Sequence, residues 1–148
     1  MYQVEATVEF EYAHRLYNVD TFSEECRDNI HGHSGKLTVI VGRDKLNHAG
    51  MVIDFKLLKH ILNTAIVDKF DHACILNSAD PLCECISKEC KKVVVTDESP
   101  TAEWMSKYMY HVLDNEFKNT DSNLQIVKVM VQETERNRAI YTGGSSNE

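Results

Sequence analysis

The sequence has no long apolar run, no cluster of basic residues and no paired C-x-x-C motif. No apolar stretch approaches the roughly eighteen residues that a membrane-spanning helix requires, so we expect no membrane anchor. The formal net charge is -7, and no Lys or Arg stripe could follow a phosphate backbone, which argues against a nucleic-acid-binding protein. The first residues contain neither a basic nor an apolar segment, so we expect no secretory signal.

The five cysteines, an odd number without an export signal, are typical of reduced thiols in an intracellular protein. Three of them fall in residues 78–98, a polar segment without clear periodicity that we expect to be an insertion loop, with 93–96 as a candidate short strand. They are Cys83, Cys85 and Cys90. Their spacing favours free thiols over a soft-metal site. We therefore expect a soluble cytoplasmic protein with a single domain at 1–142 and a flexible tail at 143–148.

Two alternating patterns predict neighbouring strands with one buried face. Residues 2–14 place apolar side chains on one side and polar ones on the other, and the alternation puts His14 at the end of the apolar row. A second strand over 31–42 carries His31 and His33 in phase with its apolar residues. If the two strands are neighbours, the three imidazoles converge.

The rest of the chain predicts two helices and two further strands. We expect the helices over 54–69 and about 100–117, and the strands over 124–134 and 138–142. Asp54 is suited to cap the first helix, Phe55 begins its buried stripe, and Pro100 occupies the first turn of the second helix. This order predicts an α+β domain in which a four-stranded antiparallel sheet carries two helices on one face. Because such a sheet has two open edges, we expect a homo-oligomer.

Glu133 ends the apolar row of the strand at 124–134. The row before it consists of Val127, Val129 and Val131. A carboxylate in this position must be paired or hydrogen-bonded, unless the strand end has already reached water.

Two other segments contain residues suited to proton transfer. Asp71 precedes His72, so one loop can hold a proton donor and an orienting carboxylate, although Asp71 equally suits a turn. Cys26 lies five residues before His31 and is a candidate base or nucleophile. His31 and His33 can ligate zinc, while on their own they are equally explained as polar residues at a strand start.

Six short motifs in a common order resemble the 6-pyruvoyltetrahydropterin synthase and 6-carboxytetrahydropterin synthase family. They are residues 10–16, Cys26 with 31–33, 50–55, 70–72, 100–103 and 131–134. The resemblance implies the tunnelling fold (T-fold), in which trimers close a barrel and two trimers stack into a homohexamer. It also implies active sites between subunits and a small-molecule pterin triphosphate as substrate.

The resemblance further implies a role for eight residues. The implied ligands of a catalytic zinc ion are His14, His31 and His33. The implied catalytic residues are Cys26, Asp71 and His72, and the implied substrate contacts are Glu133 and Thr101. For the phosphates, the cations nearest in sequence are Arg15, Arg27 and Lys36.

Three functions are consistent with these residues. The first is a zinc-dependent carbon–oxygen lyase that converts 7,8-dihydroneopterin triphosphate to 6-carboxy-5,6,7,8-tetrahydropterin, with release of triphosphate and acetaldehyde, as in queuosine biosynthesis. The second is 6-pyruvoyltetrahydropterin synthase, and the third is a non-catalytic pterin- or purine-binding protein. The gap between Cys26 and His31 does not choose between the two enzymes, because the carboxy branch usually has a shorter gap and the pyruvoyl branch a longer one. Ala102 stands where the pyruvoyl branch commonly has a hydroxyl residue, and the compact length with the run into Pro100 and Thr101 favours the carboxy branch.

Overall fold

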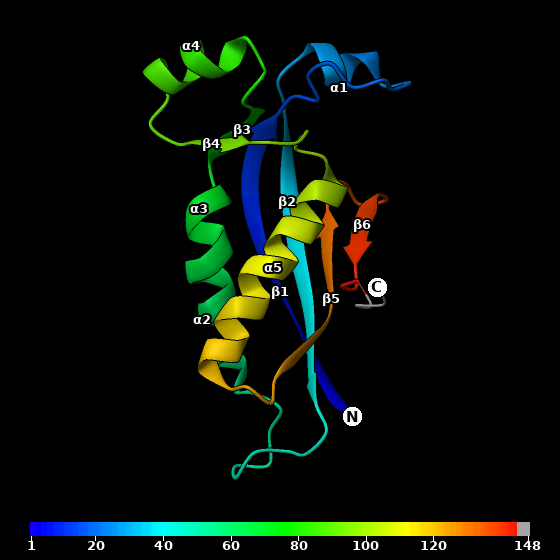
Figure 1. Ribbon diagram of the computed structural model, residues 1–148, viewed down its shortest axis with the longest axis vertical. Helices are drawn as coiled ribbons and strands as arrows, with labels where there is room; N and C mark the ends of the chain where they lie inside the picture. The colour runs from blue at the N-terminus through cyan, green and yellow to red at the C-terminus, as the bar shows by residue number, and fades with distance from the viewer. Residues whose placement is uncertain (145–148) are drawn as a thin grey trace.

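The computed structural model describes residues 1–144, which form a twisted six-stranded sheet with its main helices on one face (Figure 1). Residues 145–148 of the expected tail lie outside the described residues. The elements are β1 (Tyr2–His14), α1 (Glu24–Asp28), β2 (His31–Arg43), α2 (Phe55–Leu62), the π-helical segment η1 (Asn63–Val67), α3 (Asp68–Phe70), β3 (Ala73–Asn77), α4 (Leu82–Glu89), β4 (Val93–Thr96), α5 (Ala102–Thr120), β5 (Gln125–Gln132) and β6 (Arg138–Tyr141). Within the described part, no helix combines the length and the apolar character needed to cross a membrane.

The antiparallel pair of β1 and β2 forms the centre of the sheet. Its register runs from Tyr2 opposite Arg43 to His14 opposite His31. Burial alternates along both strands as predicted, and Leu37 and Val39 are fully buried on the helix-covered face. The long ladder places the end of β1 beside the start of β2.

The sheet is mixed and has six strands in the order β4-β3-β1-β2-β5-β6, so the expected four-stranded antiparallel sheet was wrong. β3 pairs parallel with β1, and β4 pairs parallel with β3. β3 was missed because its five residues are too few to show a period. The segment expected to be a loop at 78–98 contains the helix α4, since a parallel strand pair needs a crossover connection, and the candidate strand at 93–96 is β4.

The helical layer consists of α2, η1 and α3 in succession, packed beside α5 (Figure 1). The Asp54 carboxylate caps α2 by accepting from the backbone N–H groups of Lys56 and Leu57, as predicted. Phe55 is 56% exposed, so its expected burial was wrong: it lies on the first turn, outside the stripe that faces the sheet. Thr101, rather than a residue before Pro100, is the N-cap of α5, so Pro100 lies outside the helix.

An irregularity in β5 changes which of its residues face the core. The pairing with β2 shifts between Ile40 and Val41, which leaves Val127 as an extra residue in β5. Ile126 and Val129 are therefore the buried neighbours, and the expected placement of Val127 in the apolar row was wrong. Beyond the bulge the alternation resumes through Val131 toward Glu133.

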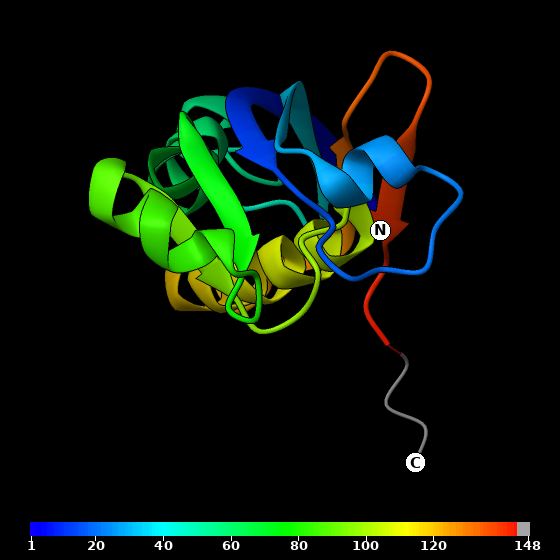
Figure 2. The same ribbon diagram turned by 90° about the horizontal axis from the view of Figure 1, so that it is seen from above.

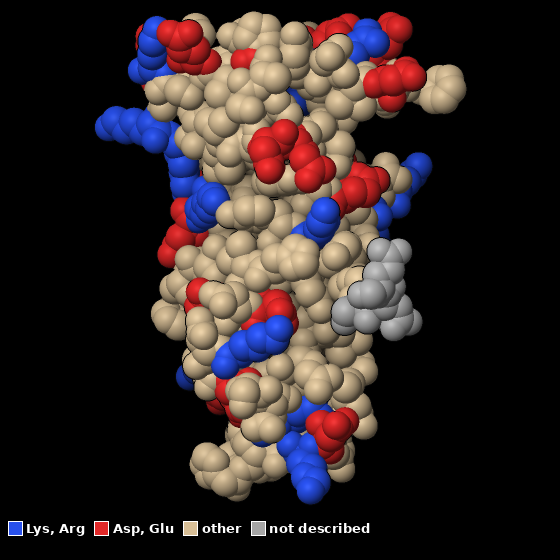
Figure 3. All heavy atoms as spheres, viewed as in Figure 1, with Lys and Arg blue, Asp and Glu red and all other residues tan. Residues whose placement is uncertain are grey.

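The two short helices α1 and α4 both lie at one end of the sheet, apart from each other (Figures 1 and 2). The sequence did not predict α1, because its five residues are too few to show a helical period. On the face in Figure 3, Lys and Arg side chains are scattered among Asp and Glu side chains. The end that carries α1 and α4 is also where β1 ends and β2 begins.

Candidate metal and pterin site

Three histidines converge where β1 ends and β2 begins. His14 pairs with His31, and Tyr12 pairs with His33, so all these side chains share the helix-covered face. The ring centroids of His14 are 4.6 Å from His31 and 5.1 Å from His33. One ligand atom from each histidine lies within 4.8 Å of the other two. The predicted convergence of the imidazoles is therefore present.

Backbone carbonyls fix two of the rings. His14 Nδ1 lies 2.7 Å from the Pro100 carbonyl oxygen, and His31 Nδ1 lies 3.0 Å from that of Asn29. A carbonyl only accepts, so each Nδ1 carries the proton and each Nε2 is left with a lone pair when the ring is neutral. Within the described chain, the Nε2 atoms of His14 and His33 are buried without a hydrogen-bond partner. Orphaned nitrogens of this kind fit a metal ion.

His14 is held in the form that binds metals. Burial lowers its pKa to about 4, against the opposing effect of the hydrogen bond to Pro100, and His31 and His33 lower it further. At neutral pH the His14 ring is therefore uncharged, as a metal ligand must be.

Glu133 lies beside the histidines and is held by Tyr12. The Tyr12 hydroxyl donates to Glu133 Oε1 at 3.1 Å, and the same oxygen lies 3.6 Å from His14 Nε2. Burial, followed by the charge of Glu133, raises the pKa of Tyr12, so the phenol keeps its proton and remains a donor. The Glu133 side chain is 24% exposed, which leaves it reachable by a ligand.

Asp71 and His72 form a pair anchored to the backbone of β1. Asp71 Oδ2 lies 2.8 Å from His72 Nδ1, and Asp71 Oδ1 accepts from the Glu11 N–H at 2.8 Å. The Glu11 N–H, and then His72, hold the pKa of the Asp71 carboxyl below its usual range. His72 has a φ of 59°, a left-handed conformation fixed by its own N–H, which donates to the Glu11 carbonyl at 2.6 Å. Its side chain is 77% exposed.

The Asp71–His72 pair lies on the opposite side of the sheet from the three histidines. His72 lines a hollow of about 650 Å³ together with residues 11–13 of β1 and 32–34 of β2, in which the outward-facing Glu11 and Ser34 alternate with Tyr12 and His33. Among residues 1–144, no recorded polar contact joins the pair to the histidines. One chain therefore brings the predicted metal ligands and Glu133 together, but not the predicted acid/base pair.

Cys26 lies on α1 at the same end of the molecule as the histidines. Its carbonyl accepts from the Leu16 N–H at 2.9 Å, which ties α1 to the chain that leaves β1. The thiol is half-buried and does not belong to the three-residue ligand cluster. Thr101 lies next to Pro100, and its hydroxyl accepts from the Trp104 N–H at 3.1 Å, so the structure gives it a capping role.

A sequence model of the family described as 6-pyruvoyl tetrahydropterin synthase matches residues 3–144. The chain belongs to the 6-pyruvoyl tetrahydropterin synthase family. The resemblance drawn from the six motifs is thereby confirmed, and the three histidines and Glu133 belong to a chain of this family.

Curated relatives and solved structures agree with this family. A protein from Aquifex aeolicus named 6-carboxy-5,6,7,8-tetrahydropterin synthase is 28% identical, over 95% of this chain and 97% of its own. One of the same name from Haemophilus influenzae is 28% identical, over 90% and 94%. The structure of 6-pyruvoyl tetrahydropterin synthase from Caenorhabditis elegans matches with a TM-score of 0.68 and 26% identity, over 97% and 96%.

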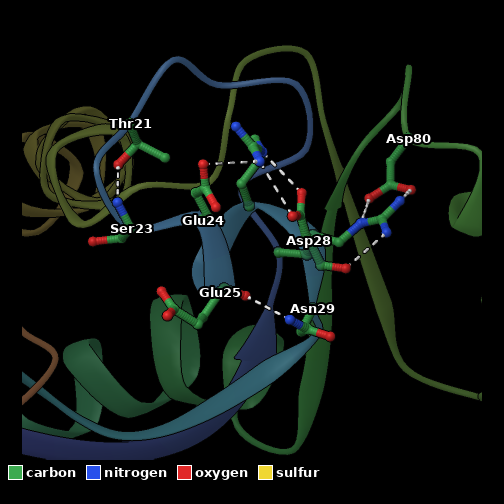
Figure 4. A network of polar contacts seen from close by, with 9 residues as sticks. Thr21, Ser23, Glu24, Glu25, Asp28, Asn29 and Asp80 are labelled. Carbon is green, nitrogen blue, oxygen red and sulfur yellow. Dashed lines mark hydrogen bonds and ion pairs between the residues drawn. The ribbon is translucent and has the colours of Figure 1, made fainter.

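The two arginines expected near the phosphates each form an ion pair with an aspartate, Asp80 or Asp28 (Figure 4). Arg15 makes a two-point ion pair with Asp80, whose side chain is fully buried, with Nε to Oδ2 at 2.7 Å. Arg27 binds its neighbour Asp28, with Nε to Oδ1 at 2.8 Å. The Arg15 pair therefore ties the end of β1 to the segment before α4, whereas the Arg27 pair joins two neighbouring, partly exposed residues of α1.

Sequence reasoning missed three residues that shape this site. Tyr12 was assigned only to the core, although its place two residues before His14 was a usable signal. Asp80 was not singled out, because its partner Arg15 lies 65 residues away. Gly35 leaves room for the rings of β1: a Cβ there would lie 2.8 Å from the Tyr12 ring and 3.1 Å from Phe10.

Proposed function

We propose that the protein converts 7,8-dihydroneopterin triphosphate to 6-carboxy-5,6,7,8-tetrahydropterin, with release of triphosphate and acetaldehyde. The observation that carries the proposal is the convergence of three imidazoles, two of them with orphaned Nε2 atoms, beside a carboxylate. The names of the curated relatives favour this product over the pyruvoyl product.

The residues that would hold zinc are His14, His31 and His33. Three histidine ligands leave zinc an open position and its full charge, which makes the hydroxyl groups and adjoining C–H of a bound side chain more acidic. The Pro100 and Asn29 carbonyls orient two of the ligands, as outer partners of metal-bound histidines commonly do.

Glu133 is suited to hold the pterin ring. A carboxylate can accept two parallel N–H bonds from an aminopyrimidine edge, which explains why an anion stands at the end of a buried row. The Tyr12 hydroxyl donates to one oxygen of the Glu133 carboxylate and so orients the carboxylate toward the ring. The pterin is thereby placed with its side chain toward the histidines.

Proton transfer falls to Cys26 and His72 in this proposal. Cys26, a free and half-buried thiol on α1, takes a proton from the substrate side chain as the general base. His72, oriented by Asp71, can return a proton along the same side chain. Thr101, on the segment beside the metal ligands, keeps its hydroxyl proton for a substrate oxygen.

The position of the Asp71–His72 pair supports an active site that is completed by a neighbouring copy. The pair is exposed on the face opposite the metal ligands, so in our proposal it serves the site of an adjacent subunit in a barrel-closing trimer. Both edge strands present an apolar side chain: Val95 on β4 and Ile140 on β6 are each 53% exposed. At the far end of the sheet the exposed Phe55 and Met51 suit the stacking of a second trimer.

The test is to incubate the zinc-loaded protein with 7,8-dihydroneopterin triphosphate and identify the products by mass. We expect 6-carboxy-5,6,7,8-tetrahydropterin together with acetaldehyde. A pyruvoyl product would assign the protein to the other branch of the family. Binding of the pterin without any product would indicate a non-catalytic binding protein.

Replacing Cys26 with Ala is expected to lower turnover by at least about 100-fold while zinc remains near one per chain, because removal of a general base leaves the metal site intact. Turnover and zinc content are measured on the same preparation. The matched control is Cys85→Ala, whose exposed thiol on α4 lies outside the site. Loss of zinc from the Cys26 variant would show that the thiol is a ligand.

Replacing Glu133 with Gln is expected to weaken pterin binding by roughly 10- to 100-fold, because charge-assisted hydrogen bonds to the ring are lost. The Gln carbonyl can still accept from Tyr12, so zinc content and folding should be unchanged. Calorimetry with 7,8-dihydroneopterin measures the affinity, and Glu135→Gln, 87% exposed in the same turn, is the control. An unchanged affinity would refute the role of Glu133 as anchor.

A further inference from the structure

The hollow beside His72 contains cations that the proposed reaction does not yet use. Its lining includes the small residues Ala13 of β1 and Gly32 of β2. Its rim carries His72, together with Lys91 and Lys92 from the link between α4 and β4. The lysines therefore share one hollow with the residue proposed to transfer protons.

These two lysines differ from the other cations at this end of the molecule. Arg15, Arg27 and Lys88 are each paired with a carboxylate. In residues 1–144, no ion pair is recorded for Lys91 or Lys92. Their charge is therefore available to an anion.

Lys92 is positioned by the catalytic pair itself. Its Nζ donates to the Asp71 carbonyl at 2.6 Å, and the side chain is half-buried. An ammonium group has three N–H donors, so two remain for another acceptor. The one carboxylate lining the hollow, Glu11, accepts a hydrogen bond from Ser34 at 2.8 Å.

We infer that Lys91 and Lys92 bind the triphosphate of the substrate whose ring is held by a neighbouring copy. The inference rests on the proposed function, including the service of His72 to an adjacent subunit. In that substrate the side chain on which His72 acts connects the pterin ring to the triphosphate. The residues that bind the triphosphate must therefore lie farther from Glu133 than His72 does. Because the chain has a net charge of -7, a strongly anionic group needs local cations to enter.

The lysines come from the link between α4 and β4, within the crossover that joins the parallel strands β3 and β4. In our proposal this link supplies the cations for the phosphates, while Arg15 and Arg27 are paired with Asp80 and Asp28. The expected specificity is for a triphosphate over the dephosphorylated pterin.

The test uses Lys91→Gln, Lys92→Gln and the double variant of the full zinc-loaded protein. We expect each single substitution to raise KM for the triphosphate substrate by roughly tenfold, and to weaken competitive inhibition by inorganic triphosphate by the same factor. Inhibition by 7,8-dihydroneopterin, which lacks the phosphates, should be unchanged. Lys88→Gln, which removes an exposed lysine of α4 already paired with Glu84, is the matched control.

The outcomes separate this inference from the proposed function. Unchanged KM and inhibition in the double variant would overturn the phosphate role while the function stands. A fall in kcat of Lys92→Gln without a change in KM would overturn binding by Lys92 and make it a positioning residue for Asp71. If the protein has no turnover, calorimetry with inorganic triphosphate decides: weaker binding by the double variant than by the wild type supports the inference, and equal or absent binding overturns it.

Discussion

His33→Ala is expected to empty the metal site and to reduce turnover below detection while the sheet stays folded. His33 lies at the start of β2, is only partly buried, and contributes an Nε2 atom that has no hydrogen-bond partner within the described chain. Loss of a residue that only supports a metal ligand lowers metal affinity by roughly 10- to 100-fold. Loss of one of the three ligands should therefore lower zinc affinity by more than about 100-fold. Metal analysis after dialysis and a product assay measure the two effects.

The matched control is His60→Ala, which removes an exposed histidine on α2 and should leave both zinc and turnover unchanged. Circular dichroism distinguishes loss of the metal from loss of the fold. Full zinc content in the His33 variant, with an intact fold, would contradict the assignment of the metal ligands.

Mixing two inactive variants, Cys26→Ala and His72→Ala, is expected to restore turnover after their subunits have exchanged. If His72 serves the site of a neighbouring copy, some sites combine an intact Cys26 with an intact His72. For random mixing of equal amounts, about a quarter of the sites should be active, because half carry each intact residue independently. Activity is measured after joint refolding or co-expression.

The control mixes Cys26→Ala with His33→Ala, two changes at the same end of one chain and in the same half of the proposed site. This mixture should remain inactive, since every site then lacks either the base or the metal. No recovery in the first mixture, with mixed oligomers demonstrated by mass, would place His72 in the site of its own chain.

The convergence of the metal ligands could be predicted from the sequence because it depends on two local rules. Side chains alternate along a strand, so His14 and Tyr12 share a face, as do His31 and His33. Once β1 and β2 pair as antiparallel neighbours, the end of one strand meets the start of the other. No long-range packing has to be known.

The position of His72 could not be predicted in this way. It depends on β3, whose five residues run parallel to β1 and are specified by tertiary packing rather than by a repeating pattern. The hollow beside His72 also includes Lys91 and Lys92, which follow α4 in the connection from β3 to β4. The Arg15–Asp80 ion pair is likewise a contact between distant segments, which the spacing of neither residue reveals.

The most direct test of the central claim is X-ray absorption at the zinc edge of the purified, zinc-loaded protein. We predict one zinc per chain with three imidazole nitrogens at about 2.0–2.1 Å and the remaining position filled by oxygen. The outer-shell scattering of imidazole rings identifies the nitrogens as histidine, and the pattern should weaken in the His33 variant. A sulfur ligand at about 2.3 Å would contradict the account, because it would make a cysteine part of the metal site.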